Sequence, residues 1–322
     1  MNSLLKILCD GHFHSGEELG RLLGISRAAV WKQIQKIEQM GLDVKSHRGC
    51  GYCLMTELEL FDKNTLIHSL SQTSGSLIKE LRIESSVSST NDLVRHAAER
   101  GDATGLIVLA EQQTAGRGRR GRQWVSPFGR NIYLSLGWGF DGGVQVLEGL
   151  SLAVGVAVRR AIKSCGVDGL MFKWPNDLFL ENKKVGGILL EILGDPSGFC
   201  QVVVGVGINL GMSDKNGKLI DQPWTDIRSV SGQPVSRNGL AAAIIEEMMA
   251  LLANFHEVGF EAYREEWLQS DINADKEVSL LLMNKTIQGI ARGVDESGAL
   301  KLEVGEEIKL FSGGEISVRS AG

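Results

Sequence analysis

A loop rich in arginine and glycine contains the residues of this 322-residue sequence that most clearly indicate chemistry. It runs from Glu111 to Trp124 and reads Glu-Gln-Gln-Thr-Ala-Gly-Arg-Gly-Arg-Arg-Gly-Arg-Gln-Trp. Its arginines are Arg117, Arg119, Arg120 and Arg122. Glycine lets a backbone wrap closely round a ligand, and guanidinium groups suit anions with two or more oxygens, such as phosphate or carboxylate. The loop is therefore predicted to close over an anionic ligand; the alternative is a solvated basic turn.

Other polar motifs interrupt or end predicted strands. Ser88-Ser89-Thr90-Asn91 lies between a predicted strand (82–87) and a predicted helix (92–100), where its side chains either cap the helix or face a ligand. Lysine, asparagine and aspartate are costly inside a central strand, so their presence indicates a site. The remaining motifs are Lys173-Trp-Pro-Asn176-Asp177, Lys184-x-Gly-Gly, Gly205-x-Gly-Ile-Asn209 and Pro223-Trp224 after the polar segment 212–222.

Familiar nucleotide motifs are excluded by context. The run Gly116 to Gly121 matches the dinucleotide pattern, but Gln123 to Pro127 cannot open the helix that this pattern requires. Gly217-Lys218 is followed by Leu219, where a phosphate-binding loop needs a hydroxyl. No Cys/His nucleophile or pair of carboxylates stands out. Anion binding without a protein nucleophile suits a reaction in which one substrate attacks the phosphate of another, as in adenylation.

Bulk composition favours a cytoplasmic globular protein of two or three domains. The chain has 43% apolar residues, a net charge of −5 and a pI near 5.8, which argues against wholesale coating of nucleic acid but permits a local basic face. The sequence has no uninterrupted apolar window of about 18 residues, so no membrane span is predicted. No export signal is visible. The five cysteines are expected to be reduced.

Cys50 and Cys53 have the spacing of a redox or zinc half-site. Zinc needs four ligands and only His47 lies nearby, while a redox pair should open a helix and Cys53 runs into residues that look extended. A functional role for the pair is therefore disfavoured.

Residues 1–60 are predicted to form a winged helix-turn-helix. Ser26 caps a helix over 27–40 whose apolar positions form one stripe, and a hairpin with a glycine-containing turn follows it. The second helix of such a unit enters the major groove with its N-terminal residues. The alternative is a small domain that contacts only protein. The predicted DNA-binding residues are Ser26, Arg27, Ala28, Lys32 and Lys36.

The rest of the chain divides into a linker at 61–80, an α/β catalytic domain at 81–270 and a small β-barrel at 271–322. The linker contains one predicted helix, at 63–71. The barrel is predicted from turn residues between short strands. These strands are expected at 278–283, 286–294, 299–304, 308–311 and 316–319.

The motifs occur in the order found in bacterial biotin protein ligases, and with the N-terminal unit the chain resembles the bifunctional ligases that also repress the biotin operon. The resemblance implies an α+β multidomain fold: a winged helix-turn-helix, a mixed α/β domain of the biotin/lipoate ligase type and an SH3-like barrel. It implies that biotin and ATP give biotinyl-5′-adenylate, and that biotin passes to a lysine of a biotin carboxyl carrier protein.

Site roles follow from the same resemblance. Lys184, Arg119 and Arg117 would be catalytic, with Lys184 at the carboxylate and α-phosphate. Asp177 is a candidate Mg²⁺ ligand. Counting back from the first loop glycine selects Gln113, not Gln112. Biotin would be held by Ser89, Thr90, Asn91, Gln113, Arg117, Gly118, Arg119 and Lys184. The adenylate would contact Arg119, Arg122, Asn176, Asp177, Lys184, Asn209 and Trp224.

The adenylate is expected to order the loop and promote a homodimer that binds a two-fold operator. Two alternatives are a lipoate-type ligase or acyltransferase, and a non-catalytic repressor that senses a small ligand.

Overall fold

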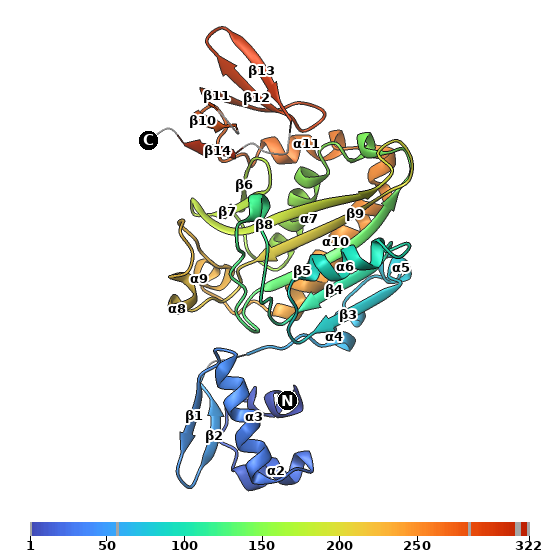
Figure 1. The fold of residues 1–322 in the computed structure, drawn as a ribbon. Coiled ribbons are helices and arrows are strands. Elements are labelled where there is room, and N and C mark those ends of the chain that lie inside the picture. Colours follow the sequence, from blue (N-terminus) through green and yellow to red (C-terminus); the bar gives the residue numbers. More distant parts are fainter. Residues whose placement is uncertain (1, 56–57, 283–284, 313–316, 321–322) are drawn as a thin grey trace.

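Three helices and a hairpin form the N-terminal unit (Figure 1) in a computed structural model that describes residues 2–55, 58–282, 285–312 and 317–320. Its elements are α1 (Asn2–Leu8), α2 (Gly16–Leu23), α3 (Arg27–Gln39), β1 (Val44–His47) and β2 (Gly51–Leu54). Serine caps explain where α2 and α3 begin. The Oγ of Ser15 accepts a hydrogen bond from the Glu18 amide at 3.0 Å, and that of Ser26 accepts one from the Ala29 amide at 3.2 Å. Gly24 ends α2 with a φ of 66°, so the tight turn is formed as predicted.

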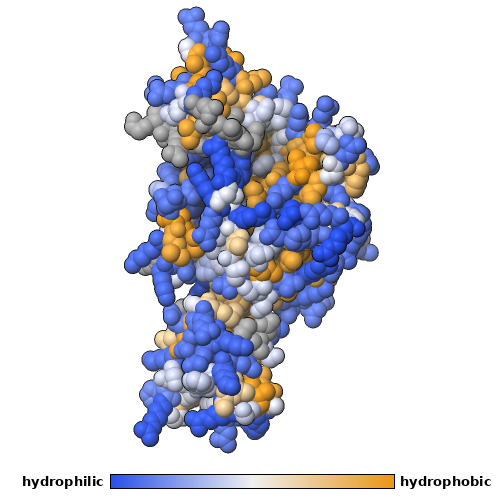
Figure 2. Space-filling view, in the orientation of Figure 1, coloured by the Kyte–Doolittle hydropathy of each residue, from blue (hydrophilic) through white to orange (hydrophobic). Residues whose placement is uncertain are grey.

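The apolar stripes of these elements meet in one core. Phe128, which follows the arginine-glycine loop, is 1% exposed and packs in this core although it belongs to the central unit. The N-terminal unit is therefore joined to the central unit by apolar contact as well as by the chain, across the narrow waist visible in Figure 2. The other buried members are Leu4, Leu5, Leu8, Leu19, Val30, Ile34, Ile37, Leu42, Leu54 and Leu58.

A seven-stranded sheet forms the centre of the molecule, in the order β3-β4-β5-β9-β8-β7-β6. Only the pair β3 and β4 is parallel. Residues 171–180 form two strands and not one, because Pro175 lacks the N–H that a central strand needs. The strands are β3 (Glu80–Glu84), β4 (Leu106–Ala110), β5 (Ile132–Phe140), β6 (Met171–Lys173), β7 (Asp177–Leu180), β8 (Lys183–Gly194) and β9 (Cys200–Ile208).

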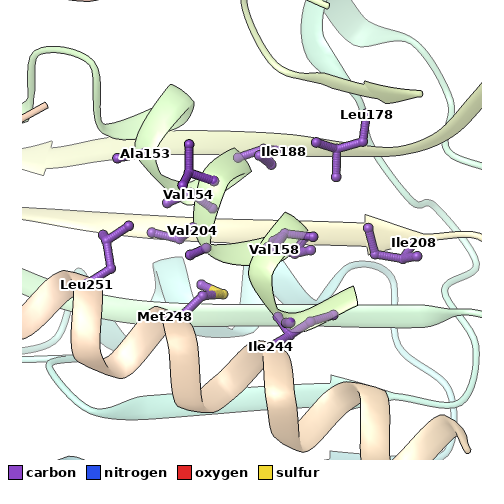
Figure 3. Packing of buried hydrophobic residues seen from close by; sticks show 14 of the residues in the cluster. Ala153, Val154, Val158, Leu178, Ile188, Val204, Ile208, Ile244, Met248 and Leu251 are labelled. Carbon is purple, nitrogen blue, oxygen red and sulfur yellow. The ribbon is translucent and has the colours of Figure 1, made fainter. Parts of the chain in front are cut away.

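Helices cover both faces of the sheet. α7 and α10 pack against one face, where Val158, Val204 and Met248 interdigitate (Figure 3). α6 covers the other face. Successive side chains of β4 point to opposite faces, so Ile107 packs in the core that includes α7 and α10, and Val108 packs in the core that includes α6. The helices are α4 (Lys63–His68), α5 (Gln72–Leu77), α6 (Thr90–Ala98), α7 (Leu150–Ser164), α8 (Asp214–Gly217), α9 (Ile227–Ser231), α10 (Arg237–Val258) and α11 (Glu261–Leu268), with single 3-10 turns at Arg119–Gly121 and Val144–Leu147.

One segment differs from expectation. Residues 61–80, expected as a linker with one helix, contain α4 and also α5, and both pack against α10. Leu66 of α4 is fully buried in the central core, so this segment is part of the central unit. By length and composition alone α10 passes the test for a membrane span. Its apolar residues, however, are buried against α7 and β5, as in the core helix of a folded domain.

The C-terminal unit is an antiparallel sheet in the order β13-β12-β11-β10-β14. Trp174 links it to the central unit, because its Nε1 donates to the Gly298 carbonyl at 3.0 Å. Residues 283 and 316, expected as strand ends, lie outside the described residues. The strands are β10 (Glu277–Leu281), β11 (Thr286–Val294), β12 (Leu300–Val304), β13 (Glu307–Phe311) and β14 (Ser317–Ser320).

Candidate active site

A cavity of 860 Å³ opens between the arginine-glycine loop, the start of α6, the β7–β8 hairpin and the end of β9. The structure brings every predicted ligase-site residue to its wall, although they span more than a hundred positions. They are Ser89, Thr90, Asn91, Gln113, Arg117, Gly118, Arg119, Arg122, Asn176, Asp177, Lys184, Asn209 and Trp224.

One wall is a network of neutral polar groups. The Oε1 of Gln113 accepts hydrogen bonds from the Thr90 amide at 2.9 Å and the Thr90 hydroxyl at 3.1 Å. Its Nε2 donates to the Ser126 hydroxyl at 3.2 Å. Because both ends of the Gln113 amide are used, the start of the loop is fixed against the start of α6. Gln112 does not line the cavity, and its Oε1 accepts a hydrogen bond from Ser86 at 3.4 Å.

Asn91 extends this wall toward the sheet. Its Nδ2 donates to Glu191 of β8 at 2.8 Å, and its Oδ1 lies 2.6 Å from the Ser135 hydroxyl of β5. A Cβ at Gly205 would lie 2.2 Å from the Asn91 Oδ1. The glycine in β9 is therefore what lets this buried amide sit on the sheet.

Ser89 bears on the alternative, left open by the sequence, between helix capping and ligand contact. It occupies the N-cap position of α6 with extended backbone, yet its side chain makes no capping hydrogen bond. Ser89 is 3% exposed and lines the cavity. The geometry therefore favours a ligand-facing hydroxyl over a helix cap.

The opposite wall is cationic. The Nζ of Lys184 lies 2.6 Å from the Asp177 carboxylate and 5.8 Å from the centre of the Trp124 ring. Backbone hydrogen bonds fix Lys184, because its amide donates to Pro223 at 3.0 Å and its carbonyl accepts from Thr225 at 2.9 Å. An anionic ligand can therefore replace Asp177 as the partner of a preplaced ammonium group.

Arg119 adds a second cation. Its Nη1 donates to the Asn176 Oδ1 at 3.2 Å. Burial lowers the pKa of this guanidinium, Arg120 lowers it further and Asp177 opposes the change. Arginine stays charged in proteins despite such shifts, so the site holds a partly desolvated positive charge, which an anion would stabilise.

Arg117 is turned toward carboxylates on neighbouring elements. Its Nη2 lies 2.6 Å from Asp92 of α6 and 3.3 Å from Glu191 of β8. These three side chains form an ion-pair cluster, called the latch below, that holds the loop tip over the cavity. Its members are partly exposed, so we expect each pair to contribute about 1 kcal/mol or less.

Asn209 and Trp224 shape the floor. Asn209 is buried, its Nδ2 donates to the Thr225 carbonyl at 3.1 Å, and its Oδ1 accepts from Asn131 at 3.4 Å. Those bonds give the Asn209 side chain a structural role. A Cβ at Gly217 would lie 1.8 Å from the Trp224 ring, so the segment containing α8 covers that indole.

Sequence reasoning did not assign Trp124, Ser135, Asp92 or Glu191. A Cβ at Gly207 would lie 2.7 Å from the Trp124 ring, so the indole packs closely against β9, beside Lys184. The Gly205-x-Gly207 spacing was the available signal for both close approaches. The two acids carried no signal, because an acid on a helix or strand is usually a solvated group.

The residues that the structure describes contain no cluster of three or more potential metal ligands among His, Cys, Asp and Glu. Cys53 is buried in β2 and donates from Sγ to the Gly11 carbonyl at 3.1 Å, whereas Cys50 is exposed in the turn. This arrangement gives no support for a zinc or redox role. Asp177 is a single carboxylate, which fits Mg²⁺ only where substrate phosphates supply most of the ligands.

The predicted DNA-contacting residues are exposed along α3, four of them in or next to its first two turns and Lys36 in its last turn. Val30, on the same helix, packs inward. Ser26 also caps the helix, so the N-terminal end of α3 faces solvent with a partial positive charge. The five residues are Ser26, Arg27, Ala28, Lys32 and Lys36, all exposed.

Comparisons with known proteins agree with this architecture along the chain. A family model described as the biotin/lipoate A/B protein ligase family matches residues 83–209. An HTH domain model matches residues 1–53, and the biotin protein ligase C terminal domain matches 275–319. The predicted fold class is thereby confirmed.

Relatives and solved structures point the same way. The bifunctional ligase/repressor BirA of Escherichia coli (strain K12) is 40% identical over 319 residues, which cover 99% of this chain and 97% of that protein. Its namesake from Bacillus subtilis (strain 168) is 29% identical over 309 residues, covering 95% of this chain and 94% of the relative. The biotin protein ligase from Aquifex aeolicus in complex with biotin and ATP superposes with a TM-score of 0.64 at 26% identity, covering 76% of this chain and 100% of that one. The chain therefore belongs to the biotin/lipoate A/B protein ligase family, and within it to the group of bifunctional ligase/repressors.

Proposed function

We propose that this protein is a biotin protein ligase that also represses transcription of the biotin biosynthetic operon. It would activate biotin with ATP to biotinyl-5′-adenylate and pyrophosphate, and then transfer biotin to one lysine of the biotin carboxyl carrier protein of acetyl-CoA carboxylase. The observation that carries the proposal is the juxtaposition, in one cavity, of a neutral polar wall around Gln113 and a cationic wall around Lys184 and Arg119.

The two walls divide the work of the first step. The neutral wall (Ser89, Thr90, Asn91 and Gln113) offers donors and acceptors for the uncharged ureido group of biotin, which needs no counter-charge. The biotin carboxylate attacks the α-phosphate of ATP and pyrophosphate leaves. Negative charge builds at this centre, where Lys184 and Arg119 stabilise it. Positioning two substrates in one cavity supplies the rest, without a protein nucleophile.

The second step needs access rather than new chemistry. The amine of the carrier lysine attacks the acyl carbon of the adenylate, an amide forms and AMP leaves. Arg117, Gly118 and Arg122 of the loop would cover the adenylate until then, so that water does not hydrolyse it. Asn176 and Asp177 would line the nucleotide side, with Trp224 as a platform for adenine. Asp177 would add one ligand to a Mg²⁺ held mainly by the ATP phosphates, which would neutralise their charge.

Repression would use the exposed start of α3. The adenylate would order the arginine-glycine loop, favour a homodimer and thereby place two N-terminal units on a two-fold operator. An enzyme serving a carboxylase and an operon would work in the cytoplasm. Operator affinity that did not change with biotin and ATP would contradict this coupling.

Biotin-dependent exchange of labelled pyrophosphate into ATP tests the enzymatic proposal. We expect exchange that requires biotin and is not supported by lipoate. Exchange with lipoate in place of biotin would favour a lipoate-type ligase. Absence of exchange with either acid would favour a non-catalytic sensor.

Lys184→Ala tests the division between the two walls. We expect adenylate formation to fall by about 100-fold or more, as for loss of one charge-stabilising donor, with a much smaller loss of biotin binding. Rapid-quench kinetics and calorimetry measure the two quantities. The matched control is Lys183→Ala, an exposed neighbour that does not line the cavity. Equal losses in rate and binding would remove Lys184 from this role.

A further inference from the structure

Trp31 is an exposed indole on the outward side of α3. Its side chain is 50% exposed, whereas the other five tryptophans of the chain, all described by the structure, are buried or half-buried. The inward side of α3 is already occupied by Val30, Ile34 and Ile37, which pack in the N-terminal core. Because helical residues three and four apart are neighbours, Trp31 lies beside Ala28 and Gln35.

The surroundings of Trp31 are basic. Arg27, Lys32 and Lys36 are exposed on the same helix, and the first turn of α3 contains no acidic residue. The helix N-terminus adds partial positive charge. An apolar group among cations matches a polyanion that also presents apolar groups, which is the chemistry of the DNA major groove.

The position of the indole on α3 fits the same partner. α2, which leads into α3, lies at the end of the N-terminal unit remote from the central sheet (Figure 1). Trp31 is the fifth residue of α3. It therefore lies on the N-terminal part of the helix, which reads base edges in helix-turn-helix proteins.

The thymine C5-methyl is the apolar group that base pairs present in the major groove. We propose that Trp31 reads thymine in the operator by packing its indole against this methyl group, and so determines sequence preference. The inference rests on the proposed repressor function and adds a specificity residue to it. Lys32 and Lys36 contribute affinity through phosphates, which every sequence offers.

Selection from a random pool supplies the DNA for the test. The full-length protein, with biotin and ATP, enriches binding duplexes from a pool of random sequence. In the enriched duplex each thymine is then replaced singly by deoxyuridine, which lacks only the methyl group. We expect one position in each half-site where this change weakens binding about three- to fivefold, the effect of removing one buried methyl group.

Trp31→Ala should bind the thymine and deoxyuridine duplexes equally at that position. Unchanged protease resistance of residues 1–60 shows that the N-terminal unit of the variant is folded, and unchanged biotin-dependent pyrophosphate exchange shows the same for the central unit. Leu22→Ala, which truncates an apolar side chain on α2 that is 57% exposed, is the matched control and should keep the thymine preference. As a second readout, addition of the enriched duplex should change tryptophan emission in the wild-type protein but not in Trp31→Phe.

The outcomes separate the two proposals. Enrichment of a sequence whose thymine effects persist in Trp31→Ala would overturn the role of Trp31 and leave the repressor function intact. Enrichment of no sequence by the wild-type protein would overturn both. Loss of thymine preference in Trp31→Ala alone supports the inference.

Discussion

The tip and the base of the arginine-glycine loop are held in different ways. At the tip, Arg117 is partly exposed and contacts two partly exposed carboxylates. At the base, Glu111 is ion-paired with Arg237 at the start of α10, whose side chain is 1% exposed. Phe128, where the chain leaves the loop, is packed in the N-terminal core. The tip is therefore held by weak, screened interactions and the base by buried ones.

This difference indicates how one loop can serve two functions. A ligand that supplies a few kcal/mol can open or close the tip while the base keeps its place. The base also binds the chain that leads to the N-terminal unit, because Glu111 accepts a hydrogen bond from the Phe61 amide at 2.8 Å and Arg237 donates to the Glu59 carbonyl at 3.1 Å. The same segment thus lines the cavity at one end and contacts the N-terminal unit at the other.

Breaking the buried ion pair should have the largest effect on stability. Arg237→Met leaves the Glu111 carboxylate buried without its partner, so we expect a loss of about 3–5 kcal/mol in the free energy of unfolding, measured by urea titration. The double variant Glu111→Gln with Arg237→Met removes both charges and should recover much of the loss. A loss of less than about 1 kcal/mol in the free energy of unfolding of Arg237→Met would show that the buried ion pair does not hold the base.

Phe128→Ala should come next. Removing a buried phenyl group from the N-terminal core should cost about 3 kcal/mol, at the lower end for such truncations because the site lies between two units. Urea titration, with protease sensitivity of residues 1–60 as the signal, measures this loss of stability. Pyrophosphate exchange should persist. Phe13→Ala, which truncates a ring that is 42% exposed, is the control. Exchange lost in parallel with stability would mean that the base is part of the catalytic unit alone.

Asp92→Asn tests the tip. Weakening the latch on Arg117 should change the free energy of unfolding by less than about 1 kcal/mol. Release of bound adenylate should nevertheless become a few-fold faster, measured by stopped-flow chase. Glu99→Gln removes a carboxylate at the end of α6 that, like Asp92, pairs with Arg95, and it should leave release unchanged. A loss of stability as large as that of Arg237→Met would erase the distinction between tip and base.

The sequence was informative where residue type alone is unusual for its context. Four arginines among glycines, or Lys173 to Asp177 around a proline, are poor material for a core, so their clustering predicted a site that the structure brings into one cavity. The helix-turn-helix was predictable for a related reason, because caps and apolar periodicity are local signals.

Partners distant in sequence could not be predicted in this way. Arg237 and Glu111 are separated by 126 positions, and their pairing follows only once α10 is packed on the sheet. Glu191 reads as one more residue of a long strand, and α5 is a short helix in a stretch rich in Ser, Thr and Gly that locally favours turns. In each instance tertiary packing outweighs local preference.

The smallest expected effect is a pH dependence at the base. Burial raises the pKa of the Glu59 carboxyl, but hydrogen bonds from Asn238, Arg237 and Ser236 outweigh burial and hold the pKa below its ordinary value of 4.5. Such a group stabilises the folded state fully above its unfolded pKa, and this contribution is lost as pH falls through the lowered folded value. Urea titrations between pH 6 and about pH 3 should therefore show a shallower loss of stability in Glu59→Gln than in the wild-type protein. Glu306→Gln, which removes an exposed carboxylate in a turn, is the control, and identical slopes in all three proteins would show that Glu59 does not fasten the N-terminal unit to the base.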